Sequence, residues 1–274
     1  PTTDDDVTDA PTKGNQEGIF AYGHDGSNYI STSNLVSNAG VVATDVTGVG
    51  TGRGYMGACE YGTDKGICGF GTDGTKYGMT NLVSNAGVVA TDVTAVGTAR
   101  SSLSACSYGE DKGIFGFGND GSVCDITNLV SNAGVVASDV TGVGTARSGL
   151  AACEYGGDKG IFGGGGSGPL GMTNLVSNAG VVASDVAAVM TPKYLLAACG
   201  YGYDKGIFAY GSTGSYVSTS NLVSNAGVMS SDVTGVGTAK AYLAATQYNG
   251  DKGIFGYGYT DTNTSQTNLV SNAG

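Results

Sequence analysis

The sequence predicts an all-β protein built from six similar units. The heptapeptide NLVSNAG occurs six times, and successive copies start 46 or 47 residues apart. Its copies begin at Asn34, Asn81, Asn128, Asn174, Asn221 and Asn268. A fixed period of this size is the signature of a repeat fold. No apolar period of 3.6 residues runs through the unit, whereas short β-branched runs alternate with Asn, Asp and Gly turns, so strands rather than helices are expected.

One complete unit, residues 98–144, divides into four runs that are typical of strands. The runs are 101–108, 112–118, 124–131 and 135–143. The turn Asn119-Asp120-Gly121 between the second and third runs suits a hairpin, because these residues adopt positive φ at least cost. Four antiparallel strands in a repeat of this length form the blade of a β-propeller. A β-solenoid is the competing repeat fold, although its coils are usually shorter than this unit.

Residues 18–67 resemble a kelch repeat. In kelch blades a strand ending in a glycine-rich run is followed by an Asp-Gly turn, two further strands and a basic residue that opens the next blade; here these features fall on 20–23, Asp25-Gly26, the NLVSNAG run and Arg53. The Trp and the Tyr-Asp-Pro stretch of many kelch units are missing. The phrases DKGIFGYG, TNLVSNAG and GVGTAR resemble the near-identical kelch-like repeats of tailed-bacteriophage virion proteins. The resemblance implies a six-bladed kelch-like β-propeller of virion origin.

We expect one domain over residues 1–274, with repeats from 17 to 274 and a closing segment at 1–16. Asp6-Val7-Thr8 matches Asp45-Val46-Thr47, so residues 1–10 are predicted to supply the fourth strand of the last blade. The first unit has lost about eight residues of its first strand. This loss predicts either a gap or a position filled by another chain.

Charge and hydropathy exclude some classes of function. The net charge is −11, and ten of the twelve bases fall at two fixed positions of the repeat, so no basic patch remains for a nucleic-acid backbone. No apolar run approaches the roughly 18 to 20 residues of a membrane helix. We expect no nucleic-acid partner, no membrane span, and a location in a virion or outside the cell.

The sequence predicts no metal, cofactor or catalytic residue. Four of the six cysteines share one repeat position, where the last unit has Thr246, so they are expected to be reduced core residues. His24 is the only histidine and there is no CxxC, which excludes zinc spacing and the histidine ligands of a copper site. An acidic cluster near the start lacks calcium-loop spacing. A Ser-His-Asp triad would need His24, and no nucleophile elbow accompanies it. The acidic cluster comprises Asp4, Asp5, Asp6 and Asp9.

Two rings of recurrent charges are expected around the repeat. The first is an Asp-Lys dipeptide, which either lines one face and holds an anion or sugar, or is a hairpin turn with a solvated Lys; exposed pairs contribute only about 0–1 kcal/mol, which favours the turn. Its copies begin at Asp64, Asp111, Asp158, Asp204 and Asp251. The second ring is expected to pair with Asp residues of neighbouring blades. Its members are Arg53, Arg100, Arg147, Lys193 and Lys240, and the acids are Asp45, Asp92, Asp139, Asp185 and Asp232.

The loops between the second and third strands vary while the rest of the unit is nearly constant. Variation on a rigid scaffold is typical of a binding face, although unconstrained loops would also vary. The candidate ligand-binding residues are Tyr29, Lys76, Tyr77, Asp125, Tyr216 and Tyr259. Together with these loops, the resemblance to phage virion repeats implies a non-enzymatic structural or attachment module of a phage tail, fibre or capsid surface, whose partners are other virion proteins and a host-surface glycan. A carbohydrate-binding adhesin is the alternative, and an enzyme is the third possibility.

Overall fold

The computed structural model describes residues 16–94, 96–187 and 189–274, and within these ranges it contains seventeen strands and no helix. In chain order the strands are β1 (Gly18–His24), β2 (Tyr29–Val36), β3 (Gly57–Tyr61), β4 (Lys65–Gly69), β5 (Thr80–Val83), β6 (Ser104–Tyr108), β7 (Lys112–Asn119), β8 (Val123–Val130), β9 (Ala151–Tyr155), β10 (Lys159–Gly163), β11 (Thr173–Val176), β12 (Ala197–Tyr201), β13 (Lys205–Ala209), β14 (Ser220–Val223), β15 (Ala244–Tyr248), β16 (Lys252–Gly256) and β17 (Thr267–Val270). The all-β prediction is confirmed.

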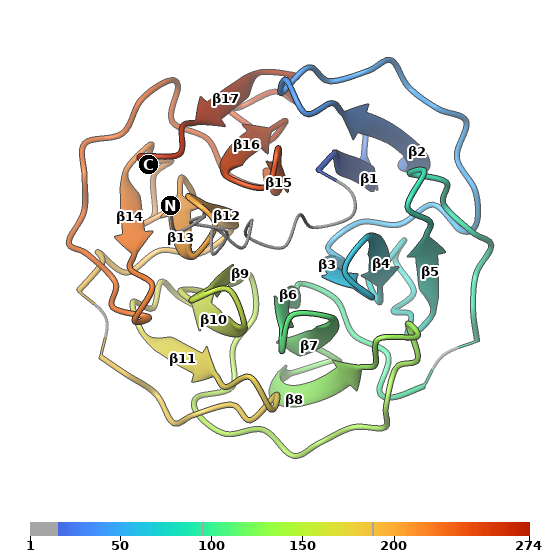
Figure 1. Cartoon of the computed structure of the whole chain (residues 1–274), viewed down its shortest axis with the longest axis horizontal. Coiled ribbons are helices and arrows are strands. Elements are labelled where there is room, and N and C mark those ends of the chain that lie inside the picture. Colours follow the sequence, from blue (N-terminus) through green and yellow to red (C-terminus); the bar gives the residue numbers. More distant parts are fainter. Residues whose placement is uncertain (1–15, 95, 188) are drawn as a thin grey trace, which may run out of the picture.

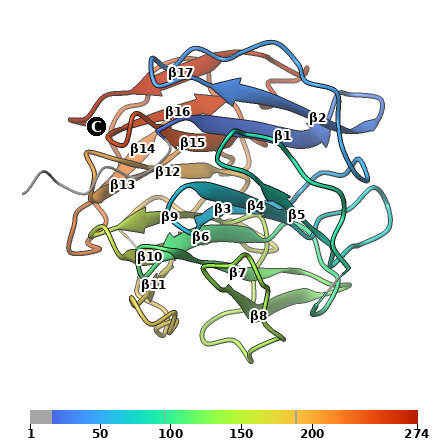
Figure 2. The same cartoon turned by 45° about the vertical axis from the view of Figure 1, so that its right-hand side comes forward.

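The strands form six small antiparallel sheets that follow one another around a central axis (Figures 1 and 2). Sheet 1 is β1–β2, and sheets 2 to 6 are the three-stranded sets β3–β5, β6–β8, β9–β11, β12–β14 and β15–β17. In each three-stranded sheet the first strand lies nearest the axis, and we call the three positions inner, middle and outer (Figure 1). Among the described residues, sheet 1 has only the middle and outer strands. The segment before β1, on which the predicted loss of a first strand falls, lies almost wholly outside the described residues.

Four regular strands per sheet were expected, and that prediction is not confirmed. In sheets 1 to 5 the fourth run is held to the outer strand by two isolated antiparallel bridges, such as Val83 to Val89 and Thr80 to Val93 in sheet 2. A side chain interrupts the ladder between them. The Asn81 Nδ2 donates to the carbonyl of Ala90 at 2.9 Å, so an amide side chain takes a backbone acceptor that a regular strand would have used.

Sheet 6 packs directly against sheet 1, so contacts between sheets continue around the whole ring. The rings of Phe20 and Tyr257 meet edge to face at 5.3 Å between centroids. The N–H of Asn249 donates to the carbonyl of Gln16. The predicted closing strand, residues 1–10, and the acidic cluster within it lie outside the described residues.

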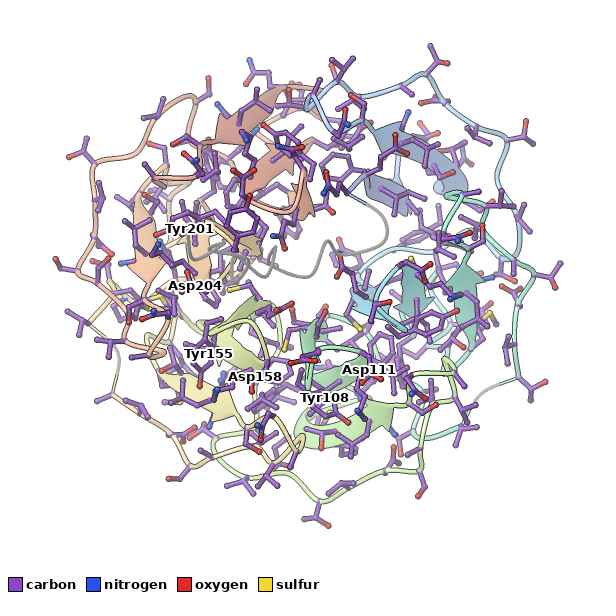
Figure 3. The ribbon with its side chains drawn as sticks, viewed as in Figure 1. Tyr108, Asp111, Tyr155, Asp158, Tyr201 and Asp204 are labelled. Carbon is purple, nitrogen blue, oxygen red and sulfur yellow. The ribbon has the colours of Figure 1, made fainter. Side chains whose placement is uncertain are left out.

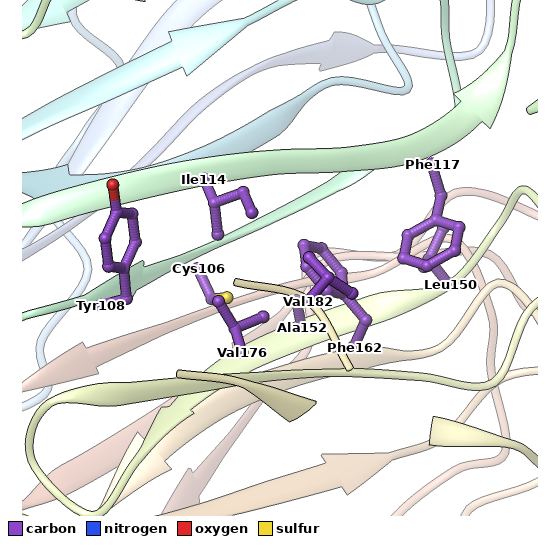
Figure 4. Close-up of a cluster of buried hydrophobic side chains, with 9 residues drawn as sticks. All are labelled: Cys106, Tyr108, Ile114, Phe117, Leu150, Ala152, Phe162, Val176 and Val182. Atoms are coloured by element: carbon purple, nitrogen blue, oxygen red, sulfur yellow. The ribbon is translucent and has the colours of Figure 1, made fainter. Parts of the chain in front are cut away.

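Each interface between sheets is a separate apolar layer. Between sheets 3 and 4, Cys106, Tyr108 and Ile114 face Phe162 and Val176, and all of them are buried (Figure 4). The middle strands alternate Gly with large residues, and at most of these glycines a neighbouring sheet comes too close for a side chain. A Cβ at Gly116 would lie 2.7 Å from the Cζ of Phe162. The second-strand glycines are therefore explained by close packing.

The first Asn of NLVSNAG links three segments of the fold. In sheet 2, the Nδ2 of Asn81 also donates to the carboxylate of Asp92 at 2.9 Å, and its Oδ1 accepts from the guanidinium of Arg53. Asp92 in turn accepts from the Thr51 hydroxyl at 2.8 Å. One buried amide thus joins the outer strand, the fourth run and the segment that arrives from sheet 1.

The last four letters of the motif form a turn that touches the neighbouring sheet. In sheet 3 the Ser131 Oγ accepts from the N–H of Val135, and the Asn132 Nδ2 donates to Asp111 at 3.0 Å. Gly134 has φ of 75°, and a Cβ there would lie 2.9 Å from the Tyr61 ring of sheet 2. Glycine is required here both by the left-handed backbone and by the approaching ring. NLVSNAG therefore provides both a turn and a contact with the neighbouring sheet.

A fully buried cation fills each of five junctions between sheets. Arg100 lies between sheets 2 and 3, where its Nε donates to the Phe117 carbonyl at 2.8 Å, its guanidinium donates to Asn128 Oδ1 at 2.7 Å, and its Cζ stands 4.1 Å from the centre of the Phe70 ring. The five cations are Arg53, Arg100, Arg147, Lys193 and Lys240, all with no exposed surface. A buried charge is tolerated only when its hydrogen-bond donors have acceptors and its charge is compensated. Here the hydrogen bonds satisfy the donors and the aromatic ring compensates the charge.

The expected pairing with Asp is confirmed in part. Arg53 lies 3.5 Å from Asp92 and Arg147 lies 3.7 Å from Asp185. These distances are longer than the bonds that the guanidinium groups make to Asn and to backbone carbonyls, so the Asp carboxylates act mainly through Asn and Thr. Desolvation alone would raise the pKa of Asp92, but bonds from Asn81 and Thr51 hold it below its usual value.

The junction between sheets 4 and 5 departs from the three arginine junctions in three ways. Lys193 replaces the arginine, as Lys240 does between sheets 5 and 6, and it donates to the carbonyl of Thr219 at 3.2 Å. Gly164 stands where other junctions have an aromatic ring under the cation. The Oδ1 of Asn221, whose counterparts accept from arginine, is buried without a hydrogen-bond partner. An unsatisfied buried acceptor costs about 1–3 kcal/mol, so this junction is the weak one among the five.

We expect Lys193→Arg to stabilise the protein, by about 1 kcal/mol, because a guanidinium reaches Asn221 Oδ1 as Arg147 reaches Asn174. The matched change Arg147→Lys should destabilise it by about 1–3 kcal/mol, since it leaves Asn174 Oδ1 unpaired and weakens the contact with the Phe117 ring. Chemical unfolding followed by circular dichroism measures both. Equal effects of the two substitutions would contradict the argument.

The advantage of Lys193→Arg should shrink as the pH rises. Burial lowers the pKa of Lys193 from 10.5 to about 8. Between these values the folded wild type releases a proton that the unfolded chain retains, so the wild type gains stability as the pH rises, whereas an arginine does not titrate. From pH 7 to pH 9.5 the difference in unfolding free energy between the two proteins should fall by about 2 kcal/mol. A difference that stays constant with pH would show that Lys193 is not desolvated.

Candidate functional site

At one end of the ring, residues that lie just before the inner strands link neighbouring sheets by backbone hydrogen bonds. Each adopts a left-handed backbone and donates its N–H to the carbonyl of its counterpart in the preceding sheet: Ser102 to Tyr55, Gly149 to Ser102, Leu195 to Gly149 and Tyr242 to Leu195, at 2.7 to 3.1 Å. Sheet 1 has no counterpart among the described residues. There the rings of Tyr55 and Tyr242 meet edge to face, with 6.1 Å between centroids.

Five tyrosines gather around this point. The ring of Tyr242 lies 6.4 Å from that of Tyr259, which lies 6.2 Å from Tyr216. On the other side Tyr29 reaches the residue next to Tyr55, because a Cβ at Gly54 would lie 3.2 Å from the Tyr29 ring. We call these residues the tyrosine arc: Tyr29, Tyr55, Tyr216, Tyr242 and Tyr259. The arc crosses sheets 1, 2, 5 and 6 at the end of the ring that carries the variable loops.

The arc offers apolar faces and polar tips to a ligand. Tyr55 and Tyr242 are 45% and 49% exposed, so each ring is half covered and held in place while its other half meets solvent. Partial burial raises the pKa of both hydroxyls, which keeps them protonated and able to donate. Rigid tyrosines combine a large contact area with hydrogen bonding at little entropic cost. This combination suits the alternating apolar and hydroxyl faces of a sugar, or the side chains of a protein partner.

Three of the six predicted site residues belong to the arc: Tyr29, Tyr216 and Tyr259. The others do not join it. Lys76 donates to Asn119 Oδ1 at 2.8 Å in the adjacent loop, and the Tyr77 hydroxyl donates to Asp73 at 2.9 Å within its own turn. Asp125 lies in β8, where its backbone is packed against Gly142.

The sequence interpretation missed Tyr55 and Tyr242. Both precede an inner strand rather than lying in a variable loop. A signal was available, because the equivalent positions hold Tyr, Ser, Gly, Leu and Tyr in successive units, which is a departure from the repeat. Only the ring geometry brings the first and last of these positions together.

His24 takes part in a turn. Its Nδ1 accepts from the N–H of Gly26 at 3.0 Å, and its ring meets Tyr29 edge to face at 4.9 Å. The neighbouring Asp25 accepts from the backbone N–H groups of Ser27 and Asn28, which lower its pKa. These bonds stabilise the loop that presents Tyr29.

The Asp-Lys dipeptides lie at the other end of the sheets, in the turns between inner and middle strands, and the turn interpretation is confirmed. Figure 3 shows Asp111, Asp158 and Asp204 in successive sheets. Each Lys side chain is partly exposed and pairs with its own Asp, as Lys65 does with Asp64 at 2.8 Å. This bond is the main cause of the lowered pKa of Asp64. The Asp and Lys charges of each turn therefore pair with one another within that turn.

The cysteines are free thiols that fill space between sheets. Cys106 and Cys153 are buried against the middle-strand glycines of the next sheet, with the Sγ 2.5 Å from where a Cβ of Gly160 or Gly206 would stand. Desolvation raises the pKa of these thiols, so they remain protonated and unreactive. The predicted role of core filler is confirmed.

No helix in the described ranges has the length and apolar character that crossing a membrane requires. No protein-family model matches the sequence, and no curated protein matches it either.

Proposed function

We propose that the protein is a six-bladed kelch-like β-propeller that serves as a non-enzymatic, virion-associated structural or attachment module. Six antiparallel sheets in a closed series of contacts support the propeller, with each fourth run as the short edge of a blade. Because only two isolated bridges hold that run, it is attached to its sheet more weakly than a regular strand would be. The proposal follows the resemblance of the repeat wording to phage virion proteins.

The tyrosine arc is the observation that carries the attachment role. Recurrent charges are used between sheets or within turns, whereas the arc departs from the repeat and offers partly exposed aromatic rings. We propose a host-surface glycan as its ligand. Binding, rather than catalysis, fits an arc of protonated tyrosines.

The outer rim supports a structural role. One valine of each fourth run stands 63% to 66% exposed in sheets 1 to 5. These residues are Val41, Val88, Val135, Val181 and Val228. An apolar side chain repeated around a rim is suited to lateral contact with neighbouring assembly proteins. A free-standing carbohydrate-binding adhesin is the second candidate, and the arc alone would serve it equally well.

Glycan binding by the arc is tested with Tyr242→Ala. The substitution removes the ring that contacts both Tyr55 and Tyr259, so we expect glycan affinity on an array to fall at least tenfold, in line with about 1.5 kcal/mol for a central aromatic contact. The control is Tyr203→Ala, which removes an exposed tyrosine from a turn at the opposite end of sheet 5. Equal loss in both variants, or unchanged binding by Tyr242→Ala, would contradict the proposal. Fractionation of native particles separates the virion role from the adhesin role.

A further inference from the structure

An inner strand makes the same side-chain contacts at every complete junction. In sheet 2 the Sγ of Cys59 lies 2.5 Å from where a Cβ of Gly113 in sheet 3 would stand. Two residues later, the ring of Tyr61 lies against Gly134, in the NLVSNAG turn of sheet 3. We call these two glycines receptors, because each leaves room for a side chain of the inner strand of the preceding sheet. A side chain at either glycine would displace that strand. The first contact recurs between Cys106 and Gly160, Cys153 and Gly206, Cys199 and Gly253, and Thr246 and Gly18.

The turn after the inner strand adds a backbone bond to the next sheet. In sheet 2 the N–H of Gly62 donates to the Asp111 carbonyl at 2.8 Å. The same bond joins Gly109 to Asp158, Gly156 to Asp204, Gly202 to Asp251, and Asn249 to Gln16. Five of the six junctions therefore share one pattern of recognition.

The junction between sheets 1 and 2 has the receptors without the strand. Gly66, Gly87 and Asp64 of sheet 2 are the equivalents of Gly113, Gly134 and Asp111. No inner strand of sheet 1 faces them, and β1 pairs only with β2 within the described ranges. Among the described residues, one edge of β1 is therefore left without a partner strand.

A cavity of about 180 Å³ extends from the axis of the ring into this junction. Ile19 and Leu35 of sheet 1 and Gly66, Cys68 and Val83 of sheet 2 line it, with Gly87 at one end. The apolar side chains at this junction, Ile19, Leu35 and Val83, continue the kind of layer found between the other sheets, in which an inner strand places its Cys and Tyr. The chemistry of the missing occupant is thus defined by five filled examples in the same molecule.

We propose that this gap binds an extended peptide strand from another polypeptide, with the pattern small–Ala–Cys or Thr–any–Tyr–Gly or Asn. The pattern occurs five times in this sequence, and all five copies already serve as β3, β6, β9, β12 and β15. We therefore assign the gap to a strand donated by a partner polypeptide.

The bound strand runs antiparallel to β1 and completes sheet 1. Its Cys or Thr side chain lies on Gly66, its Tyr ring covers Gly87, and the N–H of its final residue donates to the Asp64 carbonyl. Main-chain hydrogen bonds to β1 supply much of the affinity and the Tyr supplies the specificity, as in other cases of strand addition. The ligand needs only the five-residue strand and the turn residue that follows it. The residue that would precede this strand is not needed, because the rings of Tyr55 and Tyr242 already meet at its position.

The test uses a labelled peptide, AATQYNG, which copies residues 244–250 and avoids thiol chemistry. We expect it to bind the full chain in fluorescence anisotropy and, in excess, to raise the melting temperature by mass action. A peptide carrying Tyr248→Ala should bind at least tenfold more weakly. Absence of binding by AATQYNG, or equal binding of the two peptides, overturns the proposal.

A matched pair of variants places the binding in the gap. A Cβ on Gly66 would meet only ordinary contacts, the nearest being 3.4 Å from Val83, so Gly66→Ala should fold with an unchanged melting temperature yet bind AATQYNG at least tenfold more weakly. Gly113→Ala makes the same change where Cys59 already stands, so it should lower the melting temperature. Undiminished peptide binding by Gly66→Ala would show that the peptide binds elsewhere and overturn the assignment.

Discussion

The buried cation between neighbouring sheets is the constraint on which the ring depends. A guanidinium without exposed surface must find acceptors for its donors, and in this fold they are two backbone carbonyls and the Oδ1 of the first Asn of NLVSNAG. That Asn also fixes the fourth run, which cannot then form a regular strand. Removing either the buried cation or this Asn destabilises the fold by more than the intact pair stabilises it, so each unit must keep both residues.

Because the recurrent polar groups are committed to the scaffold, binding chemistry is left to positions where the units differ. The tyrosine arc is made from such positions, drawn from the first, second, fifth and sixth sheets. Its rings rest on a rigid end of the ring where backbone bonds link each sheet to the next. A regular scaffold therefore supports an asymmetric face without altering the junctions that hold it together.

The shortened first unit is the largest departure from the repeat. Sheet 1 still contacts both neighbours through Phe20 and Tyr22, because its middle and outer strands carry the residues that face the adjoining layers. An inner strand at this position would add contacts toward sheet 2 alone, since inner-strand side chains contact the following sheet. The contacts between sheets thus continue around the ring although the described residues supply no inner strand to sheet 1.

The sequence by itself determined the all-β class, the number of units and the role of the cysteines. These properties are local or periodic, so a seven-residue phrase repeated at 47 residues is enough to reveal them. Only the tertiary structure decided that the fourth run is held by two bridges, that Lys76, Tyr77 and Asp125 lie apart from the arc, and that Tyr55 meets Tyr242. The reason is physical: these outcomes depend on which groups meet across a closed ring, and residues far apart in the chain become neighbours only when the last sheet packs against the first.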